Sequence, residues 1–407
     1  MSLPGETAVT SQQLQPAAPP VGRSDEVPPL AVKPGPRLVI RGREIPVVLP
    51  RRGDPRLRVS AVILTVQVLG QTVLGFKVSI AQILVSIGLC AVVEIGVTLF
   101  REHTLAWPAS GLLTGNGVAF ILRASGTRHG DWWSLHGIQY FVLAAGLSLL
   151  SKYLIRPGGR HLFNPSNFGV VWTLLVIGPK YVFPQYLWWG RLTSTPVLLA
   201  FAVIIAGGVW VLRPVRMTPM ALAFLATFVP LVALLAASGR NFAAIWHSGP
   251  VSGASYWATI CVSPELLIFV FFMMSDPQTA PKSRSGRMVY GAATAVLAAA
   301  LLAFQPTEFG IKLSILSSLT VLCALVPLVE AAVGWWGRRH SPATGPQAAP
   351  AAQPRPLRQR LVAAALSPAV VAAAIIAVAA PADTAALARN KQLINIERGL
   401  TGSKNPQ

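Results

Sequence analysis

Apolar residues dominate the chain in long runs, which are separated by short polar or basic segments. A membrane-spanning helix needs about 20 mainly apolar residues to cross the hydrocarbon core. Runs of suitable length predict ten transmembrane helices, at residues 59–76, 78–100, 106–123, 136–155, 165–182, 195–212, 217–237, 255–275, 287–304 and 310–334. The pattern therefore predicts an all-α polytopic membrane protein.

The N-terminal tail, residues 1–58, has a different character from the rest. Its first 36 residues are rich in Pro, Ala, Gln and Ser, and we expect them to be disordered. Residues 37–48 alternate apolar and polar positions around Arg41-Gly42-Arg43, which fits a small hairpin on the membrane surface. The tail is also basic, and we expect it on the cytoplasmic side.

The C-terminal region leaves two alternatives open. A linker rich in Pro and Gln covers 341–354, and the tail 381–407 is polar. Between them, the apolar stretch 361–380 is long enough to be an eleventh spanning helix. It is also Ala-rich and contains Pro368, so a peripheral helix is the other interpretation.

Composition supports a membrane location. Of the 407 residues, 53% are hydrophobic and only 12% are charged, whereas soluble domains carry about 25% charged residues. The formal net charge of +20 comes from basic residues that lie mainly between the apolar runs, where they orient the protein and contact anionic lipid. We therefore expect membrane lipid, and no nucleic acid, as a partner.

Counting Lys and Arg in the connecting segments favours a cytoplasmic N-terminus in the plasma (inner) membrane, because the inner segments then carry most of them. In this count Lys152 belongs to an inner loop, and Arg123 and Lys312 belong to outer loops. The three cysteines, Cys90, Cys261 and Cys323, all lie inside apolar runs and without the spacing of metal ligands. No zinc or all-cysteine iron–sulfur site is expected.

The chain also contains an internal repeat. The sequence FNPSNFG at 163–169 reappears as FQPTEFG at 304–310, and Pro-Ala-Ser-Gly at 108–111 reappears as Pro-Val-Ser-Gly at 250–253. The motifs recur in the same order at nearly one offset, so the third and fifth predicted helices correspond to the eighth and tenth. Each unit then has five helices, and an odd number of crossings inverts the second unit. The two inverted five-helix repeats cover residues 59–182 and 195–335.

Inverted repeats in membrane proteins place functional sites at the repeat interface, where helices are interrupted. Gly and Pro at the starts of the four motif-bearing helices break regular helix, and the freed N–H groups can bind an anion such as phosphate. The nearby hydroxyl and amide side chains are candidate ligand contacts, namely Ser110, Thr114 and Asn116 in the first unit and Ser252, Ser255 and Thr259, beside Gly253, in the second. The alternative is that these residues are helix N-caps and small residues for close packing.

Acidic residues inside apolar runs are costly and suggest function. Glu94 lies deep in the second predicted helix and Glu265 lies within the eighth. Both are candidates for a proton or cation path, and a buried structural hydrogen bond is the alternative. Asp276 and Glu308 lie near the ends of predicted helices, where capping or ion pairing explains them.

Four segments resemble one family of bacterial membrane redox proteins. HLFNPSNFGVV (161–171), VSGAS (251–255), SDPQTAPKSRSGRMVYG (275–291) and the stretch 310–330 resemble, in order, its His-Ile-Phe-Asn-Pro-Ala segment, its Ser-Gly-Ala-Thr flavinylation motif, its Asp-Pro-x-Thr-x-Pro segment and its last helix. The family comprises RnfD of the Rnf electron-transport complex and NqrB of the sodium-translocating NADH:quinone reductase. The similarity covers roughly 57–335, and the two terminal extensions resemble the enediyne biosynthesis-associated members (UnbU type).

The resemblance implies an integral membrane redox subunit that binds flavin and passes electrons through the membrane, in an enediyne natural-product context. In the family, FMN is joined by a phosphoester to the motif's Thr near the outer face, and Ser255 offers the corresponding hydroxyl here. The family also has an Asp upstream of this position, where the present chain reads His247-Ser248-Gly249-Pro250. Two alternatives therefore stay open: FMN is joined covalently to Ser255, or the chain forms no covalent bond to FMN at this position.

The family holds a second, non-covalent flavin nearer the inner face. By position, the residues that would line this pocket are Ser110, Thr114, Asn164 and Asn167. The chain has no Gly-x-Gly-x-x-Gly motif for NADH, so its electrons would come from other redox subunits or a soluble donor, with quinone as one candidate acceptor.

A transporter or exporter without flavin is the alternative function, because inverted repeats with broken helices and acids in the membrane are transporter features too. A scaffold with a degenerate redox site is a third interpretation.

Overall fold

The computed structural model describes residues 36–40, 42–50, 54–156, 159–186, 194–247 and 249–340. Helices occur in each of the ten ranges expected from the apolar runs. They are α1 (Pro55–Thr72), α2 (Ile80–Glu102), α3 (Ala109–Ile121), α4 (Ile138–Leu154), α5 (Pro165–Ile177), α6 (Thr195–Leu212), α7 (Thr218–Ala237), α8 (Gly253–Cys261), α9 (Pro264–Ile268), the π-helix η2 (Phe269–Met273), α10 (Arg284–Leu302) and α11 (Glu308–His340).

Six helical segments of the described chain are long and apolar enough to cross a membrane, at Ile80–Glu102, Thr195–Leu212, Thr218–Ala237, Gly253–Met273, Arg284–Leu302 and Glu308–Val326. These segments support a polytopic membrane protein. The helices α3, α4 and α5 are apolar but shorter. At 1.5 Å per residue, the 13 residues of α3 extend about 20 Å, which is less than the hydrocarbon thickness of about 30 Å. The count of ten crossings stays a prediction.

The eighth predicted helix, expected as one span over 255–275, is interrupted in the structure. Its first part, α8, ends at Cys261, and α9 begins at Pro264 and continues into η2. Pro264 lacks the N–H that a continuing helix would need, and the Ser263 hydroxyl accepts a hydrogen bond from the Leu266 N–H (3.1 Å) as a new N-cap. The break lies inside an otherwise apolar segment.

The part of the chain that the structure describes also contains seven short strands. In the N-terminal tail, β1 (Arg37–Ile40) and β2 (Arg43–Val48) form the expected antiparallel hairpin, and β2 also pairs in parallel with β3 (Leu105–Ala106). Two further pairs are β4 (Leu122–Ala124) with β5 (Val182–Pro184), and β6 (Asn241–Ala243) with β7 (Pro250–Ser252).

The first helix begins slightly earlier than expected, because α1 starts at Pro55 and not at residue 59. Residues 1–35 lie outside the described residues, as do the linker 341–354, the stretch 361–380 and the tail 381–407. At the other end, α11 continues to His340, beyond the predicted end at 334.

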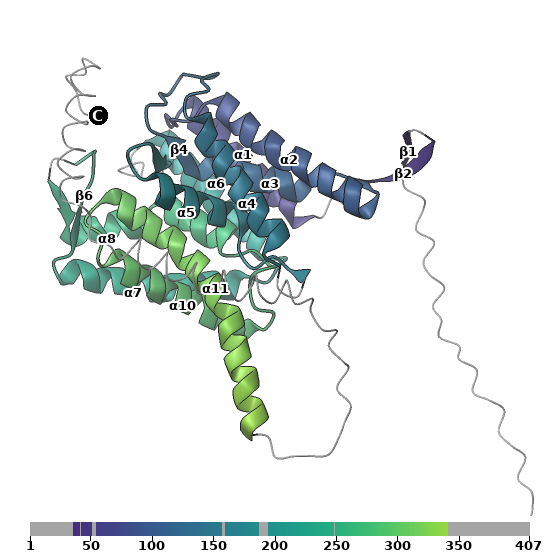
Figure 1. Ribbon diagram of the computed structural model, residues 1–407. Coiled ribbons are helices and arrows are strands. Elements are labelled where there is room, and N and C mark those ends of the chain that lie inside the picture. Colours follow the sequence, from purple (N-terminus) through teal and green to yellow (C-terminus); the bar gives the residue numbers. More distant parts are fainter. Residues whose placement is uncertain are drawn as a thin grey trace, which may run out of the picture.

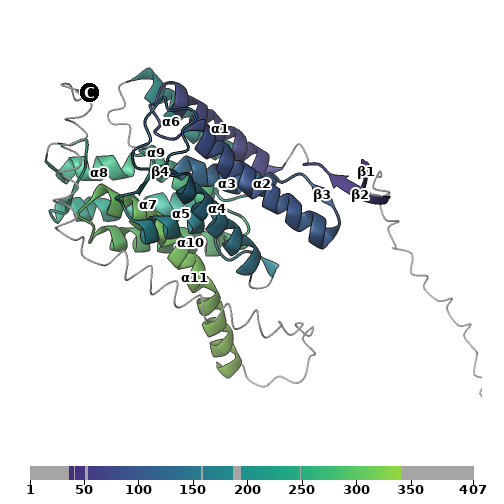
Figure 2. The same cartoon turned by 45° about the horizontal axis from the view of Figure 1, so that its top comes forward.

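The helices gather into one body, with α1–α4 on one side and α7, α8 and α10 on the other (Figure 1). The hairpin β1–β2 stands apart from this body, and the C-terminal part of α11 extends away from the other helices, as the turned view in Figure 2 also shows. One large apolar core joins side chains from both predicted units, including Val118, Phe168, Phe224, Phe269 and Leu319.

The two helices that begin with the repeated motif, α5 and α11, pack antiparallel. Near the start of α5, the Asn167 Nδ2 donates to the Leu316 carbonyl (3.0 Å) and to the Thr320 hydroxyl (2.9 Å). Beyond the end of α5, the Gln185 carbonyl accepts from Lys312, which lies earlier in α11 (3.2 Å). This pair has the relation that an inverted repeat requires, and the complete two-fold arrangement stays a prediction.

Candidate functional site

The second-unit motif lies on the surface at the start of α8. The hairpin β6–β7 leads directly into this helix, and Ser252 is the N-cap residue without a side-chain capping hydrogen bond. Gly253 has a φ of 56°, a conformation that favours glycine. Ser252, Gly253 and Ser255 are exposed and Thr259 is half-buried. An accessible hydroxyl therefore stands in the first turn of a helix, where backbone N–H groups lack helical partners and the helix dipole favours negative charge.

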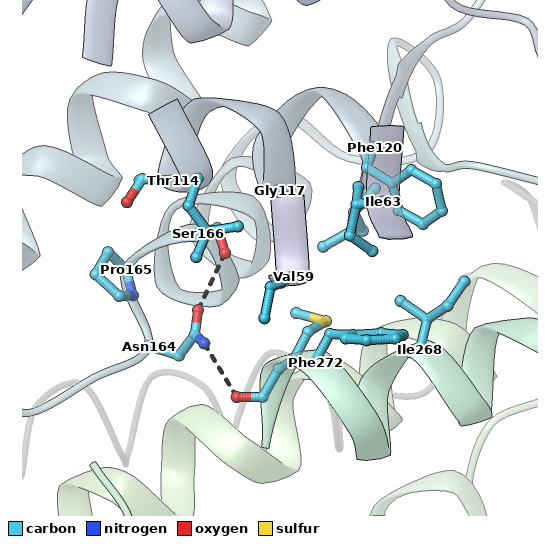
Figure 3. Close-up of a pocket in the computed structure, with 13 residues that line it drawn as sticks. Val59, Ile63, Thr114, Gly117, Phe120, Asn164, Pro165, Ser166, Ile268 and Phe272 are labelled. Carbon is cyan, nitrogen blue, oxygen red and sulfur yellow. Dashed lines mark hydrogen bonds between the residues drawn. The ribbon is translucent and has the colours of Figure 1, made fainter. Parts of the chain in front are cut away.

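The first-unit candidates Thr114 and Asn164 line a small, mainly apolar cavity of about 80 Å³ between α1, α3, α5 and the end of the broken helix (Figure 3). The side of the broken helix that faces it is the junction of α9 and η2, with Ile268, Phe272 and Met273. Single-turn π-helices occur frequently at functional sites. The cavity is much smaller than the roughly 300–1,000 Å³ of typical small-molecule sites.

The polar atoms around this cavity are engaged with one another. Asn164 Nδ2 donates to the Met273 carbonyl (3.0 Å), and its Oδ1 accepts from the Ser166 hydroxyl (3.0 Å) and from the Asn167 N–H (3.2 Å). The Thr114 hydroxyl donates to the Ser110 carbonyl (2.8 Å). Asn164 thus caps α5 and ties it to the broken helix, and Asn167 ties α5 to α11, which is the structural interpretation of these residues.

Ser110 lines a different cavity, which is polar and about 200 Å³ in volume. Glu94 of α2 and Lys152 of α4 also line it and form an ion pair there (2.9 Å). His161 lies at its edge and makes a contact of 3.2 Å with Asp276, which follows η2. The cavity therefore combines a titratable acid in an apolar helix with space for water.

Glu265 belongs to a separate ionic cluster, which consists of Glu265, Glu308 and Lys312. The Lys312 ammonium lies 3.2 Å from a Glu265 carboxylate oxygen and 3.0 Å from one of Glu308, and its side chain is fully buried. The indole N–H of Trp246 donates to the other Glu308 oxygen (3.2 Å). Glu265 lies in the first turn of α9, directly after the helix break, so the most buried charges of the described chain gather where the backbone is interrupted.

Tyr186 connects this cluster to a second buried cation. Its ring centre lies 5.2 Å from the Lys312 ammonium and 4.1 Å from the Arg123 guanidinium. Burial raises the pKa of Tyr186, so its phenol stays neutral at physiological pH. The ring therefore contributes its aromatic face to both cations.

The structure groups the predicted residues differently from the expectation of one polar cleft per unit. Thr114 and Asn164 share the apolar cavity, Ser110 lines the polar one, and Asn167 is buried against α11. Asn116 is buried, and neither atom of its amide has a hydrogen-bond partner in the described structure. The side chains are distributed in this way because α3 turns about 100° per residue, so neighbouring positions face different helices.

Ion pairing was one explanation offered for Glu308, but the burial of Lys152 and Lys312 was not expected. Lys152 and Lys312 were assigned to loops together with Arg123, whereas the structure buries all three, in α4, α11 and β4. The spacing Glu308-x-x-x-Lys312 was a readable sign of pairing one helical turn apart. Ser263-Pro264-Glu265 likewise carried the signal of a helix start within the eighth span. Within the described residues, no group of three His, Cys, Asp or Glu side chains is placed to hold a metal ion.

Residues 183–334 match the NQR2, RnfD, RnfE family. The matched part is less than half of the chain, begins in β5, and contains the VSGAS motif, the broken helix and the Glu265–Lys312–Glu308 cluster. It supports the assignment to this family and, with it, the role of a membrane subunit in a multi-subunit redox complex. No curated protein sequence matches the chain.

Proposed function

We propose that the chain is a membrane redox subunit that carries FMN on Ser255 and passes electrons between partner subunits, or to quinone, through the membrane. The observation that carries the proposal is the exposed Ser255 hydroxyl in the first turn of α8, within the range that matches the family. We extend the proposal to an enediyne biosynthetic context and to the plasma membrane with a cytoplasmic N-terminus, on the resemblance and the distribution of basic residues.

The residues at the start of α8 fit a phosphoester. A hydroxyl is the group that the bond requires, and the backbone N–H groups of the first turn can donate to the phosphate oxygens. Gly253, without a side chain, leaves the approach to this turn open, because a Cβ built there meets nothing within 4 Å. A bound flavin supplies one- and two-electron transfer. The chain's own contribution is to hold the phosphate at the helix terminus and to present the cofactor on an exposed face.

The second, non-covalent flavin does not fit the first-unit cavity. The space of about 80 Å³ beside Thr114 and Asn164 is too small, and the polar atoms there are already hydrogen-bonded within the protein. We therefore assign no step to a flavin at this position. The polar cavity beside Glu94 is the better candidate for an ion path, because it places a titratable acid next to space for water.

The first prediction tests the covalent flavin. Purified protein on a denaturing gel should fluoresce under ultraviolet light, and Ser255→Ala should abolish the band by removing the oxygen that carries the phosphoester. Ser252→Ala is the matched control, since Ser252 is an exposed serine three positions earlier, and it should leave the fluorescence unchanged. A dark wild-type band, or a bright band from Ser255→Ala, contradicts the assignment.

The polar cavity supports a transporter without flavin as the second candidate function. Glu94, Lys152 and His161 would line a route for a proton or a small ion in that case. The visible absorption spectrum after gentle detergent extraction separates the two functions. Flavin bands in the blue support the redox subunit, and a spectrum without them, together with flavin-free protein on mass analysis, supports the transporter.

A further inference from the structure

Lys312 occupies a position that resembles a binding site for a monovalent cation. Three oxygens lie within hydrogen-bond distance of its ammonium, from Glu308 (3.0 Å), Glu265 (3.2 Å) and the Gln185 carbonyl (3.2 Å). Lys312 donates a hydrogen bond to the Gln185 carbonyl, and its positive charge pairs with both carboxylates. The ring of Tyr186, at 5.2 Å, adds an aromatic face.

These ligands come from segments far apart in the sequence. Glu308 and Lys312 belong to α11, Glu265 to the start of α9 after the helix break, and Gln185 to the chain beyond β5. Carboxylate and carbonyl oxygens at an interrupted helix are the groups with which membrane proteins coordinate desolvated alkali cations. The fold thus builds an oxygen-lined cage in which the chain itself supplies the cation.

The charges of the cage favour a cation. Two buried carboxylates near one another repel, so without Lys312 the buried space would favour a bound cation or a proton shared by Glu265 and Glu308. The Arg123 guanidinium also contacts Tyr186, at 4.1 Å from the ring centre. Its positive charge partly balances the one negative charge that remains when Lys312 is paired with the two carboxylates. Lys77, 5.9 Å from the same ring, adds a third cation at the edge of the cluster.

We infer that Lys312 is a tethered occupant of a monovalent-cation site formed by Glu265, Glu308 and the Gln185 carbonyl. The lysine fills the site permanently, so Glu265 does not ligate a mobile alkali cation in this chain. Removal of the lysine side chain opens the cage to Na⁺ or to a small ammonium ion. The inference concerns the charge cluster alone and does not depend on the flavin at Ser255.

The test measures the melting temperature of the detergent-purified full chain in NaCl, methylammonium chloride and choline chloride at matched ionic strength. Lys312→Ala should melt higher in the sodium or methylammonium salt than in choline, by about 2–4 °C once the cation exceeds its Kd several-fold, because these ions fit the vacated space and choline does not. The wild type, and Lys180→Ala as the control at an exposed lysine, should show a smaller difference between the salts than Lys312→Ala does.

A second variant locates the response. The double variant Lys312→Ala, Glu308→Gln loses one carboxylate of the cage. Its melting-temperature difference between the sodium or methylammonium salt and choline should be less than half of that measured for Lys312→Ala. If the single variant folds only when purified with methylammonium, this dependence supports the inference in the same way. Equal melting of Lys312→Ala in all three salts, failure to recover it in any of them, an undiminished shift in the double variant, or a wild-type shift as large as that of Lys312→Ala overturns it.

Discussion

Gly111 and Gly115 set the distance between α2 and α3. A Cβ on Gly111 would lie 2.6 Å from the Cys90 carbonyl oxygen, and one on Gly115 would lie 2.3 Å from the Ser86 carbonyl oxygen. Two small residues four positions apart let helix backbones approach closely, as is common in membrane helices. The Pro-Ala-Ser-Gly motif therefore serves packing through Gly111, while its Ser110 lines the polar cavity.

The second prediction follows from this contact. Gly115→Ala should destabilise the protein by about 1–3 kcal/mol, because the added methyl group overlaps backbone that cannot rotate away. Gly88→Ala is the matched control within α2, since a Cβ there meets nothing within 4 Å, and it should be neutral or slightly stabilising. Melting temperatures of the two variants in one detergent provide the comparison. Equal values for both would show that α2 and α3 are not closely packed at Gly115.

Buried charge is the other feature decided residue by residue. Lys152 and Lys312 each pair with a carboxylate from another helix, Glu94 and Glu265 respectively. A buried ion pair is weak evidence of stability, but removal of one partner is strongly destabilising because the other charge stays buried. Both acids chosen from the sequence as ion-path candidates are thus also parts of ion pairs. The alternative interpretation of these acids was a buried structural hydrogen bond, which is likewise a contact with a buried partner.

At the scale of elements, helix boundaries follow local signals. Asn164-Pro165 begins α5, Ser263-Pro264 begins α9, and the Ser79 hydroxyl and Gln82 amide form a reciprocal capping box at α2. The repeated FNPSNFG and FQPTEFG sequences likewise each place an N-terminal turn, at α5 and α11. The motifs that resemble functional segments of the family therefore also have a structural role, because some of their residues begin a helix.

The third prediction concerns the cap of α5. Asn164→Ala should lower stability by about 1–2 kcal/mol, because it removes the side-chain acceptor for the Asn167 N–H and the donor to the Met273 carbonyl. Ser194→Ala is the control, since Ser194 is the N-cap residue of α6 but makes no side-chain capping hydrogen bond. Its melting temperature should match that of the wild type. An Asn164→Ala variant as stable as Ser194→Ala would remove the role given to this cap.

At the scale of the whole molecule, the relative orientation of the two predicted five-helix units determines which helix ends lie next to one another. The start of α5 meets the end of the broken helix through Asn164 and Met273, and the start of α11 meets the chain beyond β5 through Lys312 and Gln185. The first contact joins the beginning of one motif-bearing helix to the end of another, and the second joins the beginning of α11 to the segment that follows α5 and β5. This is the arrangement expected when the second unit is inverted.

The fourth prediction tests this inversion in intact cells. Ser252→Cys, at the start of α8, should react with a membrane-impermeant maleimide added from outside. Glu102→Cys, at the exposed end of α2, should react only after permeabilisation, since it belongs to the opposite surface. Cys261→Ser provides the background, because Cys90 and Cys323 are buried. Labelling of both positions from the same side would contradict the inverted arrangement.

The sequence alone determined where helices form, the hairpin at 37–48 and the repeated motifs, because apolar length, capping residues and turn signals act over a few neighbouring positions. It also indicated the family that the match at 183–334 supports. Only the tertiary structure decided which polar groups meet. Lys312 joins Glu265 across 47 positions, and Lys152 joins Glu94 across 58, since the cost of burying a charge depends on a partner that packing brings to it. The same packing divided the first-unit candidates between two cavities and α11.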